Sequence, residues 1–192
     1  MLPENKLSTH VIASSFLTPL RKSSAVDYEW GGVDIHDTSQ GLLYRIWTST
    51  YDGTSIRVTN GLRSRVLLTL KNVTYHSFAF DQNMQPCVAY VMNGKTFFWY
   101  FDTLQSKHIT LDYGVGYEYP QVTLDDHRQH QLGVSDIILS YIREDKLYYR
   151  LQRERYLQEN FLEDVPHMKL TQTGMTRNYR FRWRYVRKKQ GE

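Results

Sequence analysis

Short aromatic and β-branched runs separated by turn sequences constrain this chain more than any other feature. Between Tyr28 and about Leu170 the turns recur at short intervals, and they are Asp52-Gly53, Asn60-Gly61, Asn93-Gly94, Gly114-Val115-Gly116 and Asp125-Asp126. Asn-Gly and Asp-Gly supply the positive φ angles that two-residue turns between antiparallel strands require. The sequence therefore predicts a mainly β fold built from antiparallel hairpins.

Composition favours strands over helices in the runs between these turns. Aromatic residues make up 14% of the chain, with 15 Tyr, 8 Phe and 4 Trp, and such residues are enriched in strands. Residues 151–161 alone combine residues of high helix propensity, so we expect a helix there, although the segment continues directly from a strand-like run. The expected strands span residues 42–49, 54–59, 65–71, 75–81, 87–92, 96–101, 121–124, 136–142, 146–152 and 177–187.

A weak internal repeat accompanies the hairpins. Tyr90 and Lys95 recur as Tyr141 and Lys146, each 51 residues later, and a fainter copy covers residues 47–58. A period of roughly 40 to 50 residues with about four strands per unit is typical of propeller blades. The alternative is a β-sandwich in which a Tyr-rich sequence produces chance hairpin matches. Both folds leave strand edges that an oligomer or a partner would cover.

The chain divides into three segments by composition. Residues 1–26 are polar and show no sustained period, so an irregular N-terminal arm is expected; residues 27–170 form the antiparallel β domain, and residues 171–192 form a basic C-terminal strand and tail. The apolar stretch near Val11 is interrupted by serines, which argues against a signal peptide. No apolar run is long enough to cross a membrane, so membrane insertion is not expected.

Three groups of reactive side chains are better explained as structural than as catalytic. Residues 125–130 hold two Asp and two His, but extended backbone directs neighbouring side chains apart, so a polar loop is expected rather than a metal site. Cys87, the only cysteine, lies in an apolar run and is expected to be buried. The carboxylates near strand ends are expected to cap turns, with glycoside hydrolysis as the alternative; they are Asp81, Asp102, Asp125 and Asp126. We therefore predict no enzyme activity and no catalytic, cofactor-binding or metal site.

Positive charge is concentrated at the C-terminus, although the net charge is only +4. In residues 180–185 arginine alternates strictly with aromatic residues, so a strand would carry the arginines on one face and the rings on the other. A row of like charges favours an acidic surface on a neighbouring subunit, a solvated edge is the alternative, and nucleic acid is disfavoured by the low net charge. The predicted interface residues are Arg180, Arg182 and Arg184, with a second cluster at Arg150 and Arg153.

Residues 135–156 (SDIILSYIREDKLYYRLQRERY) and residues 174–185 (GMTRNYRFRWRY) resemble the carboxyl end of structural proteins from tailed-bacteriophage virions. Residues 78–102 are also similar to those proteins, in which the corresponding region resembles a blade-like repeat. One departure is Tyr156, where the family usually has Phe after the Gln-Arg-acid-Arg run.

The resemblance implies a non-enzymatic structural subunit of a phage tail, at the tail tip, the collar or the head-tail region. Such a subunit is made in the host cytoplasm, assembles with copies of itself and docks on other virion proteins. The alternative function is a glycan-binding β module whose Tyr and Trp side chains stack on sugars. The two overlap if the tail protein binds a host glycan.

Overall fold

The computed structural model describes residues 36–38, 41–43, 48–59, 64–81, 85–125, 136–175 and 181–189. The described part of the chain is mostly strand and contains no α-helix; one short 3-10 helix, η4, spans Gln152–Glu154. The prediction of a mainly β protein built from antiparallel hairpins is confirmed. The predicted turns Asn60-Gly61 and Asp125-Asp126 and the predicted arm, residues 1–26, lie wholly or partly outside the described residues.

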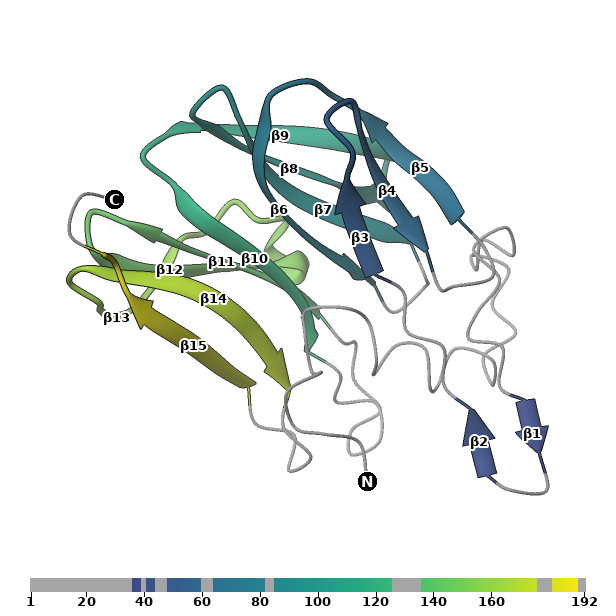
Figure 1. Ribbon diagram of the computed structural model, residues 1–192. Helices are drawn as coiled ribbons and strands as arrows, with labels where there is room; N and C mark the ends of the chain where they lie inside the picture. The colour runs from purple at the N-terminus through teal and green to yellow at the C-terminus, as the bar shows by residue number, and fades with distance from the viewer. Residues whose placement is uncertain are drawn as a thin grey trace.

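A short hairpin and four antiparallel sheets follow one another along the chain (Figure 1). The hairpin consists of β1 (His36–Thr38) and β2 (Gly41–Leu43). Sheet I contains β3 (Thr48–Tyr51), β4 (Ser55–Thr59) and β5 (Ser64–Thr69). Sheet II contains β6 (Val73–Phe80), β7 (Pro86–Met92), β8 (Lys95–Asp102) and β9 (Lys107–Val115). Sheet III contains β10 (Glu118–Asp125), β11 (Asp136–Arg143), β12 (Lys146–Leu151) and β13 (Asn160–Asp164), and sheet IV contains β14 (Met168–Met175) and β15 (Phe181–Arg187).

The internal repeat is visible in the strand register. Tyr90 of β7 lies opposite Phe97 of β8, and the residues 51 positions later, Tyr141 of β11 and Tyr148 of β12, form the matching pair in sheet III. The two turns also match, since Asn93-Gly94 and Glu144-Asp145 both have positive φ at both positions. Sheets II and III are each a four-stranded antiparallel meander, which is the unit of a propeller blade. The blade-like alternative therefore describes these two sheets better than a chance match of hairpins.

The sheets pack face to face in chain order through three hydrophobic clusters. Sheets I and II share the cluster around Ile56 and Phe78, sheets II and III share the one around Phe98 and Leu139, and sheets III and IV share a smaller one around Leu147. The first strands of successive sheets lie side by side, since β10 contacts both β6 and β14. The described sheets thus form an open stack in which each sheet covers its neighbour (Figure 1).

The predicted helix at residues 151–161 is wrong. The chain there forms only the 3-10 turn, reverses through Arg155 and Tyr156, which have φ of 52° and 60°, and then continues as β13. Positive φ at two consecutive non-glycine residues is incompatible with a right-handed helix, so tertiary contacts override the local propensity. Four strands were not predicted, namely β1, β9, β13 and β14.

Candidate docking surface

The turn at residues 152–156 connects sheet III to sheet II through polar side chains. Gln152 accepts a hydrogen bond from the backbone N–H of Ile137 at 3.0 Å, and its Nε2 lies 3.5 Å from Oδ2 of Asp81 in the neighbouring sheet. Arg155 forms an ion pair of 3.0 Å with Asp102, at the end of β8. Burial alone would raise the pKa of Asp102, but hydrogen bonds from the backbone of Gln105 and from Arg155 hold that pKa below its usual value. The polar residues of this segment therefore form hydrogen bonds and an ion pair that hold sheets II and III together.

Tyr156 completes this contact from within the core. Its side chain is 1% exposed and stands edge-on to Phe98 and Tyr100, with ring centroids 4.6 and 4.7 Å away. Burial also raises the pKa of Tyr156 well above the usual value for a phenol. Its hydroxyl has no hydrogen-bond partner among the described residues. The ring, rather than the hydroxyl, is therefore what this position contributes.

Arg150 is occupied by contacts inside sheet III. Its Nε donates to the Tyr141 hydroxyl at 2.6 Å, and one Nη donates to the carbonyls of Tyr156 and Leu157 at 2.9 and 2.8 Å. Glu159 lies between Arg150 and Arg143, with ion pairs of 3.4 and 2.9 Å. Only 11% of the Arg150 side chain is exposed, so its charge is neutralised within the molecule and offers little to a partner.

Arg153, the other residue of the second predicted cluster, is more open. Its side chain is 64% exposed, but it forms a close ion pair with the buried Asp136, and its backbone N–H donates to the same carboxylate. Sequence reasoning missed Asp136 and Glu159 as the partners of these arginines. The hairpin register held the signal for Asp136, because extending the Arg143–Lys146 pairing along both strands places Asp136 opposite Arg153.

The other reactive side chains have structural positions. Asp102 accepts the backbone N–H groups of Leu104 and Gln105, and Asp81 accepts that of Gln85, as the turn-capping interpretation predicts. Asp52, which was not among those carboxylates, caps the turn that follows it in the same way. Cys87 is buried, as predicted, and its pKa is raised by burial and by the charge of Asp81. No group of His, Cys, Asp and Glu within the described ranges has the arrangement of a metal site. The predicted loop at residues 126–130 lies outside those ranges.

Strand β15 has the two different faces that its sequence predicts. Its aromatic face is directed at sheet III: Trp183 Nε1 donates to the buried Ser140 hydroxyl at 2.9 Å, and the Tyr185 hydroxyl donates to Glu163 at 2.7 Å. Phe181 packs against Trp183, with ring centroids 4.8 Å apart. The prediction that these rings pack on the protein's own sheets is confirmed.

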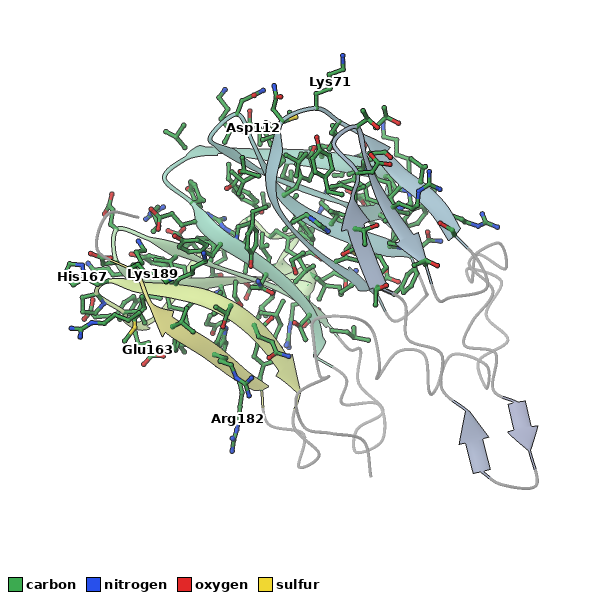
Figure 2. All side chains as sticks on the ribbon, in the orientation of Figure 1. Lys71, Asp112, Glu163, His167, Arg182 and Lys189 are labelled. Atoms are coloured by element: carbon green, nitrogen blue, oxygen red, sulfur yellow. The ribbon has the colours of Figure 1, made fainter. Side chains whose placement is uncertain are left out.

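The opposite face of β15 carries the predicted arginines. Arg182 and Arg184 are exposed, and neither has an ion-pair partner among the described residues. Figure 2 shows the Arg182 side chain extending away from the sheets. Arg180 lies outside the described residues. We call the exposed face formed by Arg182 and Arg184 the arginine face; of the cations predicted to form interfaces, these two are both described and unpaired.

Comparisons with models of protein families, with curated proteins and with solved structures found no match. Within the described part of the chain, no helix has the length and apolar character needed to cross a membrane.

Proposed function

We propose that this chain is a non-enzymatic structural subunit of a bacteriophage tail. In this proposal it docks on other copies and on other virion proteins through the arginine face. The observation that supports the proposal is the division of β15 into an aromatic face held by hydrogen bonds to sheet III and an arginine face without partners in the described chain. Like charges in adjacent positions repel, and an acidic partner surface removes that repulsion.

The segments that resemble virion proteins also have structural roles in this fold. Residues 152–156 fasten sheet III to sheet II, and β15 covers sheet III. Residues that hold neighbouring sheets together are expected in a protein whose role is structural. These sheet-to-sheet contacts support a structural subunit more than an enzyme, because the defining residues of an enzyme line a reaction site.

The alternative, a glycan-binding module, needs exposed aromatic rings on which sugars can stack. Of the aromatic residues that the structure describes, Phe161 of β13 is the one that is mainly exposed, at 54%. The other rings pack partly or wholly between the sheets, so this alternative has less support than docking on proteins.

The test is a quantitative mass-spectrometric inventory of tailed particles purified from cells that produce this chain as part of a virus. We expect its peptides at a constant, symmetric copy number relative to the major tail protein, and retained after a salt wash. Absence of the chain from the particles would refute the virion role. Specific binding on a glycan array by a monomer that is absent from particles would establish the alternative instead.

A further inference from the structure

Sheet IV ends where sheets II and III each continue by two strands. Strand β14 lies beside β10 as β10 lies beside β6, so β14 and β15 occupy the places of the first two strands of a blade. In sheets II and III the second strand pairs next with β8 and β12, respectively. Among the described residues nothing pairs with the corresponding edge of β15. An open strand edge of this kind is a template for an added strand.

The side chains of β15 specify what the added strand must contain. Directly opposite residues of an antiparallel pair share a face. A strand beside β15 therefore needs acidic residues next to Arg182 and Arg184, and apolar or aromatic residues next to Trp183 and Tyr185. A second copy of β15 does not meet this requirement, because it would place arginine against arginine.

The chain itself contains a segment with the required alternation. Residues 26–30 read Val-Asp-Tyr-Glu-Trp, so in extended conformation Asp27 and Glu29 share one face while the apolar and aromatic residues share the other. This pattern is the complement of the Phe-Arg-Trp-Arg-Tyr of β15. The segment lies outside the described residues. We propose that residues 26–30 of one copy add to the free edge of β15 in a second copy, with Asp27 and Glu29 against its arginine face.

The length of the connection favours a second copy over the same chain. Residues 31–47 lead from the segment to sheet I, and the β1–β2 hairpin folds residues 36–43 back on themselves. The nine remaining residues, 31–35 and 44–47, span about 30 Å when fully extended. Sheet I packs on sheet II, II on III and III on IV, so three face-to-face spacings of about 10 Å each already equal the full reach of this connection. Exchange between two copies does not require the connection to be fully extended, and reciprocal exchange closes as a dimer.

This inference rests on the proposed function in one respect, that the arginine face is a docking surface, and it names the first partner of that face. The experiment uses the full chain and two charge reversals. The acid-reversed variant carries Asp27→Lys and Glu29→Lys, and the base-reversed variant carries Arg182→Glu and Arg184→Glu. A control with the same charge change as the base-reversed variant is Lys71→Glu with Lys107→Glu, at exposed positions in the turn between β5 and β6 and at the start of β9.

Molar mass is measured by light scattering at low salt, with circular dichroism to verify that each variant is folded. We expect the wild type and the control to be dimeric and each reversed variant to dissociate with at least a tenfold higher Kd. An equimolar mixture of the two reversed variants should recover the dimer, because each lysine pair then meets a glutamate pair. Recovery on mixing needs both variants to be folded and requires contact between copies.

Three results would overturn the inference. The first is a monomeric wild type, and the second is dimerisation of the reversed variants like that of the control. The third concerns a variant that carries all four changes in one chain: restored folding or stability of this variant, without a dimer in the mixture of the two reversed variants. The last result would mean that the segment docks within its own copy. These failures are distinguishable from failure of the virion role, because the chain could be present in particles while the purified protein is monomeric. The converse, a dimer that exchanges charges but is absent from particles, would refute the virion role alone.

Discussion

Replacing Tyr156 with alanine should strongly destabilise the contact between sheets II and III. The side chain is 1% exposed and its ring lies 4.6 and 4.7 Å from the rings of Phe98 and Tyr100, so alanine leaves a cavity that the surrounding strands cannot fill. Aromatic-to-alanine changes in such positions cost about 3–5 kcal/mol in the free energy of unfolding. In urea, with a slope of about 2–3 kcal/mol per molar, the midpoint should fall by more than 1 M.

Tyr156→Phe is the matched control for this prediction. It keeps the ring in place and removes a buried hydroxyl that has no partner among the described residues. An unpaired buried hydroxyl costs about 1–3 kcal/mol, so Phe should match or exceed the wild-type stability. The two variants are compared by urea unfolding, monitored by tryptophan fluorescence. A loss below 1 kcal/mol for Ala, or a loss above 1 kcal/mol for Phe, would show that Tyr156 does not fasten the two sheets as described.

Three further predictions concern the surrounding contacts. Trp183→Ala should lower the free energy of unfolding by about 2–3 kcal/mol, since it removes half-buried ring area and leaves the buried Ser140 hydroxyl without its donor; an unchanged urea midpoint would refute this packing. Glu159→Ala should lower the free energy of unfolding by about 2 kcal/mol, which is less than for a fully buried ion pair because the Arg143 side chain is 30% exposed. Thermal unfolding should show this loss as a Tm several degrees lower. The pKa of Asp102 is lower in the folded protein than in the unfolded chain, so this carboxylate stabilises the fold above the ordinary Asp pKa and the stabilisation is lost as the pH falls through the folded pKa. Asp102→Asn should therefore make the free energy of unfolding less dependent on acid pH. Equal acid sensitivity in both proteins would contradict this.

Much of the fold could be predicted because its determinants are local. The Asn93-Gly94 turn and the alternating runs on both sides of it specify a hairpin, and the recurrence of Tyr90 and Lys95 identified the matching hairpin in sheet III. The alternation in residues 181–185 likewise predicted which face of β15 would pack inward. In each case a residue's environment follows from neighbours a few positions away.

The errors occurred where distant contacts decide the structure. Residues 151–161 have helix-forming side chains, but burial of Tyr156 in the core and the ion pair of Arg155 with Asp102 hold the backbone in a reversed turn. Strand β13 was missed because it is an exposed edge strand with no alternation to detect. The intramolecular partner of Arg150, Glu159, is recognisable only once β13 has been placed beside β12.

The central claim is that the arginine face is a docking surface. The variant Arg180→Gln/Arg182→Gln/Arg184→Gln tests this claim most directly. Glutamine keeps a polar, hydrogen-bonding side chain at these positions and removes the positive charge, so the isolated fold should unfold at nearly the wild-type urea concentration. Molar mass by light scattering across a salt series should show assembly of the wild type at low salt and its loss as salt is raised, because screening weakens charge pairing between copies. The account predicts that the triple variant behaves at low salt as the wild type does at high salt. Assembly of the triple variant equal to that of the wild type at low salt would show that the arginines form a solvated edge and not a docking surface.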